Sequence, residues 1–237
     1  TLEEEAQYKI IKNLREELTT KDEANKAIFN FIYGKLLSEY YGQNRYKLKN
    51  QTATESIFNP DFRTWSSSDF EKEIATAYEN SIKNETILLK TPLSNYDKII
   101  VFGKFEAPLN RSLYDFLSEK YLEKNEFHKD ESPEEKTFLS NNIHSFYGNP
   151  KEFQELDLKN YKFSPFYFRL AIYQKLEKSY ASQNNATALS NIALKRIQTV
   201  YKRRNILEEY LTVLDRFIAI TQDKYQSAFL IEKATIY

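Results

Sequence analysis

Hydrophobic residues recur along most of this chain at the three- and four-residue spacing that places them on one face of an α-helix. Residues 1–18 and 24–36 each carry such a stripe, and a Thr20–Glu23 capping box precedes the second. Gly42 follows as a natural helix stop. We therefore expect two helices joined by a short turn, forming an antiparallel hairpin. Gly34 lies inside the second helix, and its cost relative to alanine indicates that a neighbouring helix approaches closely there.

Signals for helix starts recur further along the chain. The segments Ser68–Glu71 and Ser132–Glu135 both have the spacing of a capping box. Proline follows Ser132, Asn149 and Ser164, which places it at the first helical position, where its missing N–H costs nothing. These signals predict helices that begin near residues 68, 132, 149 and 164.

Two stretches are less regular. Residues 43–65 combine Asn, Thr and Ser with an Asn59-Pro60 pair, which predicts a loop containing a short helix at 53–57. Residues 98–102 form a short apolar run and are the best strand candidate in the chain. A run of this length fits a short buried helix equally well, so both interpretations stay open.

The last third of the chain shows three apolar stripes in close succession, at 189–201, 207–218 and 225–229. Consecutive amphipathic helices with short turns are typical of α-solenoids such as tetratricopeptide arrays, although no strict repeat period is visible. The predicted fold is all-α, built from antiparallel helical hairpins and solenoid-like (TPR-like) in this third.

A charged segment in the middle of the chain, residues 123–136, separates two groups of helices. We predict two subdomains from it. Residues 1–125 form an N-terminal helical subdomain, and residues 126–237 form a C-terminal subdomain of solenoid-like helical hairpins.

Composition excludes several function classes. Lys+Arg and Asp+Glu number 34 each, so the chain lacks the basic excess of a nucleic-acid binder. Four glycines argue against phosphate-cradling loops, and the absence of cysteine excludes disulfides and thiolate sites. No apolar run approaches the ~18 residues of a membrane span. The chain begins at Thr1 and contains no methionine, so we expect a processed or excised piece.

The sequence shows no constellation with the spacing that catalysis or metal binding needs. Its two histidines, His128 and His144, stand apart from each other and from other ligand types. Paired carboxylates such as Glu134 and Glu135 lie at helix starts, where they favour the helix dipole. We therefore predict that the chain is not an enzyme and has no catalytic residue, cofactor or metal.

One cluster combines tyrosine, arginine and the only tryptophan, the residue types that dominate interface hot spots. Its members are Tyr40, Tyr41, Asn44, Arg45, Tyr46, Thr64 and Trp65. In the structural interpretation, which we favour, Trp65 and the tyrosines fill the seam between helices and Arg45 ties down a loop. In the functional interpretation the cluster binds a partner, with Arg45 stacking among the rings.

The segments LLSEYYGQNRYKLKNQT, FRTWSSSDFEKEI and SLYDFLSEKYLE resemble the N-terminal helical region of the large alpha-2-macroglobulin-like proteins of Bacteroidetes. The shared pattern is Tyr-Tyr-x-x-Asn-Arg, then Asn-x-Thr, Thr-Trp and Leu-Tyr-Asp-Phe-Leu. Here those positions are Tyr40, Tyr41, Asn44, Arg45, Asn50, Thr52, Thr64, Trp65 and 113–117. The similarity is strongest over 30–125, and the chain departs from it at Gln51, where the family more often has Arg.

The resemblance implies a non-catalytic helical scaffold or interaction region at the N-terminus of a large extracytoplasmic protein, periplasmic or tethered to the outer membrane. Its partners would be the downstream domains of the same polypeptide and other proteins, and the protease-inhibitor role would belong to the whole. The thioester of many members needs a cysteine, which this chain lacks. The alternative is a free-standing helical-repeat adaptor that binds a peptide or protein. The flanking gene sequence separates the two.

Overall fold

A computed structural model describes residues 2–19, 22–48, 61–100, 111–124, 132–161, 164–221 and 226–236. These described residues form twelve α-helices and no strand, which confirms the all-α prediction. The α-helices are α1 Leu2–Glu17, α2 Glu23–Leu48, α3 Ser67–Ser81, α4 Glu85–Lys90, α5 Leu113–Lys124, α6 Pro133–Asn141, α7 Ile143–Phe146, α8 Pro150–Gln154, α9 Pro165–Ser182, α10 Ala186–Arg204, α11 Leu207–Ile220 and α12 Ser227–Ile236. Short 3₁₀ helices are η1 Phe62–Thr64, η2 Leu93–Tyr96 and η4 Lys159–Tyr161.

The chain divides into two compact units. The first comprises Thr1–Asn95 with Ser112–Tyr121, and the second comprises Tyr96–Arg111 with Leu122–Tyr237. The solenoid-like arrangement of the C-terminal third stays a prediction.

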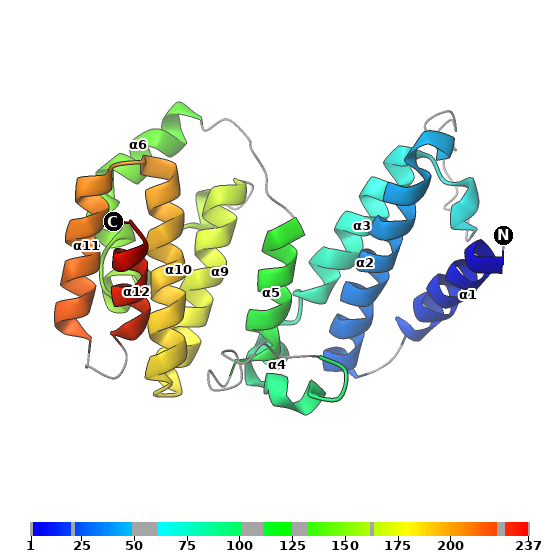
Figure 1. Ribbon diagram of the computed structural model, residues 1–237, viewed down its shortest axis with the longest axis horizontal. Helices are drawn as coiled ribbons and strands as arrows, with labels where there is room; N and C mark the ends of the chain where they lie inside the picture. The colour runs from blue at the N-terminus through cyan, green and yellow to red at the C-terminus, as the bar shows by residue number, and fades with distance from the viewer. Residues whose placement is uncertain are drawn as a thin grey trace. The chain divides into compact units, whose positions relative to one another are not determined.

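In the first unit α2 packs against both α1 and α3 (Figure 1). Its core is an aromatic and aliphatic cluster that draws on all three helices and on η1. The buried members are Ile11, Tyr33, Leu37, Leu48, Phe62, Trp65, Phe70 and Ala77. A Cβ atom added at Gly34 would lie 3.2 Å from the Cβ of Ala77, so the predicted close approach of a neighbouring helix is confirmed, and that helix is α3.

Three local predictions in the first half of the chain are wrong in position. Gly42 does not end α2, which continues to the buried Leu48, because no glycine adopts the left-handed backbone that a C-terminal stop requires among the described residues. The capping box of α3 is Ser66 with Asp69, two residues earlier than expected. Asp22, whose Oδ1 accepts from the Asn25 N–H at 2.8 Å, caps α2, and Thr20 lies outside the described residues.

The strand predicted for residues 98–102 is not formed at residues 98–100, which are the part of it that the structure describes. The N–H groups of Ile99 and Ile100 both donate to the carbonyl of Tyr96, at 3.0 and 2.8 Å, so this backbone forms a turn. Residues 101 and 102 lie outside the described residues, as does the short helix expected at 53–57. A strand needs a neighbouring strand to complete its hydrogen bonds, and the described residues offer none.

In the second unit α10 packs against α9, α11 and α12 (Figure 1), and it also contacts α7. The predicted helix starts at Ser132 and Asn149 are confirmed, since both form capping boxes with proline in the first turn. Pro165 also opens its helix, although the side chain of Ser164 makes no capping hydrogen bond. Local capping chemistry therefore fixes where α6 and α8 begin, and proline opens all three helices.

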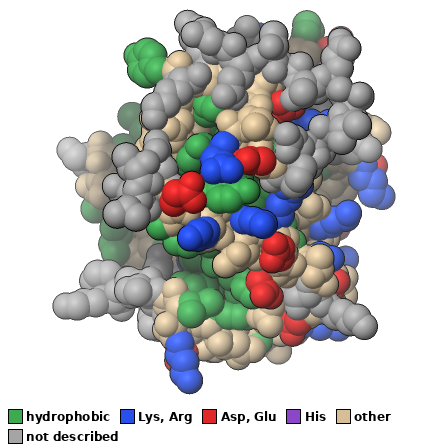
Figure 2. All heavy atoms as spheres, turned by 90° about the vertical axis from the view of Figure 1, so that its right-hand side faces the viewer, with side chains coloured by type: hydrophobic (Ala, Val, Ile, Leu, Met, Phe, Trp, Pro, Cys, Tyr) green, Lys and Arg blue, Asp and Glu red, His purple; other side chains and the backbone are tan. Residues whose placement is uncertain are grey.

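The surface seen in Figure 2 carries Lys and Arg side chains interspersed with Asp and Glu, and hydrophobic side chains lie between them. This mixture agrees with the zero net charge of the sequence. Among the described residues, no helix combines the length and the apolar character that crossing a membrane requires.

Candidate binding pocket

A pocket of about 420 Å³ opens in the second unit where the loop after α7 faces the start of α11. We call it the α7–α11 pocket. It is lined by Ile143, His144, Tyr147, Ile206, Glu208, Glu209, Thr212, Val213 and Arg216. Its volume falls within the roughly 300–1,000 Å³ of typical small-ligand sites.

The loop that forms one wall is held by two arginines from two different helices. Arg196 of α10 donates to the carbonyls of Phe146 and Gly148, the latter at 2.9 Å. Arg216 of α11 donates to the carbonyl of Tyr147 between them. Three consecutive backbone carbonyls are therefore bound to guanidinium groups, and this fixes the position of the Tyr147 side chain.

Arg196 is itself buried and paired. Its Nε lies 2.7 Å from Oε1 of Glu177 on α9, and both side chains are fully buried. The guanidinium also lies over the ring of Phe153, 4.4 Å from the centroid. Burial raises the pKa of the Glu177 carboxyl above its ordinary value, and the charge of Arg196 opposes that rise. The pair thus joins α9, α10 and the loop after α7.

Gly148 is the last residue of the loop segment that the two arginines bind. A Cβ atom added there would lie 2.6 Å from Oε2 of Glu152 and 3.0 Å from the carbonyl oxygen of His144. Only glycine leaves room for the chain to pass from α7 into α8 while presenting its carbonyl to Arg196.

Several polar atoms of the pocket have unused hydrogen-bonding capacity. Tyr147 is 3% exposed, and its hydroxyl has no hydrogen-bond partner among the residues that the structure describes. Oε2 of Glu209 likewise accepts no hydrogen bond there, and it lies 3.6 Å from Nε of Arg204. Burial, and next the charge of Glu209, raise the pKa of the Tyr147 hydroxyl above its ordinary value. Both residues belong to the pocket lining, and both unpartnered atoms are buried.

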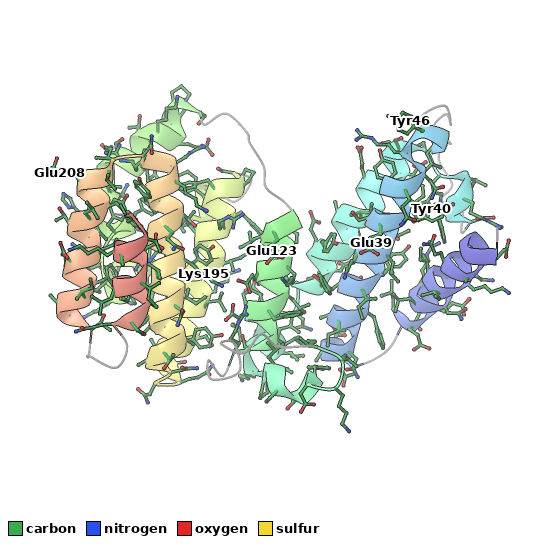
Figure 3. All side chains as sticks on the ribbon, viewed as in Figure 1. Glu39, Tyr40, Tyr46, Glu123, Lys195 and Glu208 are labelled. Atoms are coloured by element: carbon green, nitrogen blue, oxygen red, sulfur yellow. The ribbon has the colours of Figure 1, made fainter. Side chains whose placement is uncertain are left out.

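The remaining walls are apolar or lie at the mouth. Ile143, Ile206 and Val213 supply aliphatic surface, and Ile206 is 41% exposed. Glu208 projects outward from the start of α11 (Figure 3). The hydroxyl of Thr212 donates to the carbonyl of Glu208 at 2.9 Å. The pocket lining therefore combines aliphatic side chains with polar and charged ones, which suits an amphipathic ligand.

The sequence-predicted cluster lies elsewhere, in the first unit, and the structure divides it. Trp65 is 2% exposed and belongs to the core, as the structural interpretation predicts. Tyr40 packs edge-on against Phe62, with ring centroids 4.9 Å apart. The ring of Tyr41 stacks on Phe70.

The polar members of that cluster lie nearer the surface. The Asn44 side chain donates to the carbonyl of Tyr40 at 2.9 Å. Arg45 and Thr64 are exposed, and Tyr46, at the end of α2, is 94% exposed (Figure 3). The loop that Arg45 was expected to anchor lies outside the described residues. A binding role for these residues stays a prediction.

Sequence reasoning missed the α7–α11 pocket, although a signal for its support was present. Arg196 interrupts the apolar stripe of its own helix, between Ile192 and Val200. Glu177 interrupts the stripe of the preceding helix in the same way, beside Leu176. Two opposite charges at buried positions of consecutive helices indicate an ion pair, since buried charges are almost always paired.

Comparison of the chain with protein families, with curated proteins and with solved structures finds no match. Among the described residues, no group of three or more His, Asp or Glu side chains is arranged to hold a metal ion.

Proposed function

We propose that this chain is a non-catalytic helical interaction module, which binds a segment of a partner protein in the α7–α11 pocket. The pocket itself carries the proposal, because its lining combines aliphatic side chains with a tyrosine, a histidine and charged side chains. Leu207, beside its mouth, is 45% exposed and extends the apolar surface available to a partner. Pockets with apolar walls and a few placed polar groups are typical of ligand recognition.

Two settings for such a module follow from the sequence, and both are proposals. In the first, the chain is the helical region of a large extracytoplasmic alpha-2-macroglobulin-like protein, and the partner segment comes from the downstream domains of its own polypeptide. In the second, it is a free-standing adaptor for a separate protein. Support for the first rests on the motif resemblance over 30–125. Flanking gene sequence that encodes many β-sandwich domains would support the first setting.

A peptide selection tests the binding proposal. A phage-displayed library of random peptides is panned against the immobilised full chain, and enriched peptides are then measured by isothermal titration calorimetry. Thr212→Trp fills the pocket. Thr76→Trp is the matched control, because Thr76 is also an exposed helical threonine whose hydroxyl donates to the carbonyl four residues earlier.

We expect enriched peptides to bind the wild-type chain and the Thr76→Trp variant with similar affinity. Thr212→Trp should weaken them at least about tenfold, because the indole occupies their site. A library that yields no binder, or peptides that bind both variants equally, would contradict the proposal.

A further inference from the structure

Arg216 of α11 belongs to the lining of the α7–α11 pocket, and it is exposed to solvent. Its guanidinium donates to the carbonyl of Tyr147, which is a lining residue of the facing loop. The side chain therefore reaches from one wall of the pocket to the other. A guanidinium carries several N–H donors, and hydrogen bonds to the described residues engage one of them here. The others are available to a ligand.

An exposed arginine is usually a solvated surface group, but this one is held in place. The Tyr147 carbonyl binds its guanidinium, and Arg196 binds the carbonyls of Phe146 and Gly148 on either side. The loop that holds Arg216 is thus itself anchored to α10. A ligand group that binds this guanidinium has less side-chain freedom to remove than at an unrestrained surface arginine, so the usual entropic cost of a surface ion pair is reduced.

Two glutamates also belong to the lining, and their charges oppose that of Arg216 toward an anion. Oε2 of Glu209 lies 3.6 Å from Nε of Arg204, an ion-pair distance, so Arg204 offsets the charge of Glu209. Glu208 is exposed and projects outward from the start of α11 (Figure 3), where water and salt screen its charge. His144, also exposed in the lining, adds a ring N–H donor. A direct contact with Arg216 therefore outweighs the screened repulsion from Glu208.

We propose that the α7–α11 pocket binds an acidic side chain of the partner segment, whose carboxylate accepts hydrogen bonds from the guanidinium of Arg216. The inference rests on the proposed function and specifies its ligand. The two oxygens of a carboxylate match the planar fork of guanidinium N–H groups. The aliphatic side chains of Ile143, Ile206 and Val213 offer contacts to an apolar residue next to the acid. The carboxylate comes from a side chain, because a segment within a polypeptide has no free carboxyl terminus.

Three capped dipeptides that differ in one side chain test the preference for a carboxylate: acetyl-Ile-Glu-amide, acetyl-Ile-Gln-amide and acetyl-Ile-Lys-amide. Each is titrated into the full chain, and binding is followed by the methyl NMR signals of Ile143, Ile206 and Val213. The glutamate dipeptide should bind with a Kd about tenfold lower than the glutamine dipeptide, since a charge-assisted hydrogen bond is stronger than a neutral one. Equal Kd values for these two, or a preference for the lysine dipeptide, would overturn the inference. Tighter binding of N-acetyl-isoleucine, whose carboxylate is terminal, would overturn the choice of a side chain.

Two substitutions of Arg216 separate its charge from its geometry. Arg216→Gln should raise the Kd for the glutamate dipeptide about tenfold and leave that for the glutamine dipeptide within about twofold. Arg216→Lys keeps the charge without the planar fork, and it should raise the first Kd about threefold. Lys202→Gln, which alters an exposed cation of α10 outside the pocket lining, is the matched control and should change neither Kd. Unchanged binding of the glutamate dipeptide by both Arg216 variants would refute the assignment.

Glu208→Gln tests the charge balance with the opposite sign. Removal of this like charge should lower the Kd for the glutamate dipeptide about twofold and leave that for the glutamine dipeptide unchanged. An equal or higher Kd for the glutamate dipeptide would contradict the charge balance on which the inference rests. Methyl spectra of the free variants that match those of the wild type establish that the pocket is intact in each.

The two proposals can fail separately. Peptides enriched in the selection that lose no affinity when their glutamates and aspartates are replaced by glutamine and asparagine would leave the proposed function standing and overturn the inference of an acidic ligand. A clear preference for the glutamate dipeptide without any enriched peptide would support the chemistry of the site and count against a peptide-binding function.

Discussion

Both units of this protein pack aromatic rings in their interiors, and the second adds a buried ion pair. In the first, the ring of Phe62 lies within 6.4 Å of the rings of Tyr8, Tyr40, Trp65 and Phe70, centroid to centroid. The second contains the buried ion pair of Glu177 with Arg196. Apolar contacts tolerate rearrangement, whereas a buried charge requires partners in fixed directions.

The buried ion pair supports one wall of the α7–α11 pocket. The aromatic cluster of the first unit fills space around Trp65, and its member Tyr33 donates a hydrogen bond to Glu73 at 3.0 Å. In the second unit, Arg196 extends from the ion pair to two backbone carbonyls and so fixes the loop that carries Tyr147. Hydrogen bonds of this kind are directional, so they can hold the Tyr147 side chain at the edge of a cavity, where it lacks packing neighbours on one side.

Breaking the ion pair should have the largest effect. Arg196→Met leaves the charge of Glu177 buried without a partner, which costs about 3–5 kcal/mol of unfolding free energy. The orphaned carbonyls of Phe146 and Gly148 add about 1–3 kcal/mol each. Urea unfolding followed by far-UV circular dichroism measures the loss.

The double variant Glu177→Leu/Arg196→Met is the control for this effect, because it removes both charges. We expect it to recover a large part of the lost stability, although the two carbonyls stay unsatisfied.

Trp65, in the first unit, is the only tryptophan, so its fluorescence reports on that unit while circular dichroism reports on both. Arg196→Met should shift the midpoint of the fluorescence transition less than that of the circular dichroism transition. Equal shifts would contradict this separation.

The corresponding change in the first unit is Trp65→Ala. Removal of a fully buried indole should cost about 3–5 kcal/mol, through lost burial and the cavity that remains. Tyr46→Ala is the control, since that ring is 94% exposed and should contribute little to stability. A melting temperature that Trp65→Ala leaves unchanged would show that the aromatic cluster does not depend on this side chain.

A buried tyrosine of the first unit should make stability fall at alkaline pH. Burial, and next the charge of Glu39, raise the pKa of Tyr78 from 10.0 to about 12. Because the folded state favours the neutral phenol, this contribution to stability is complete below pH 10. It falls by up to about 1.4 kcal/mol per pH unit as the pH rises from 10 towards 12.

Tyr78→Phe tests this alkaline effect. Urea midpoints measured between pH 9 and pH 11.5 should fall less steeply with pH in this variant, because one buried phenol is gone. Identical slopes in the two proteins would show that Tyr78 ionises equally in the folded and unfolded states.

The smallest effect on stability is expected for Tyr147→Phe, and Tyr210→Phe provides the comparison within the same unit. The hydroxyl of Tyr147 has no partner, so Tyr147→Phe should leave the unfolding free energy unchanged or raise it by up to about 1 kcal/mol. The hydroxyl of Tyr210 donates to Glu232 at 2.7 Å, so Tyr210→Phe should lower it by about 1.5–3 kcal/mol. Thermal unfolding of both variants at pH 7 makes the comparison. Destabilisation by Tyr147→Phe as large as that by Tyr210→Phe would indicate that the Tyr147 hydroxyl is satisfied.

Local signals in the sequence predicted the helices well where the chemistry is itself local. Ser132 with Glu135 completes a capping box because both partners lie within one turn. Gly42 misled the prediction for the same reason, since a glycine permits a helix to end but does not require it. Burial of Leu48 six residues later favours continuation of α2, and that depends on residues far along the chain.

The sequence by itself determined the all-α class and the buried position of its tryptophan, because hydrophobic spacing and caps act within a few residues. Only the tertiary structure decided that Arg196 holds the loop around Tyr147, and that Glu209 and Val213 face that loop across a pocket. These contacts join residues about 50 positions apart. They depend on how α7, α10 and α11 pack together, for which periodicity within a single helix carries no information.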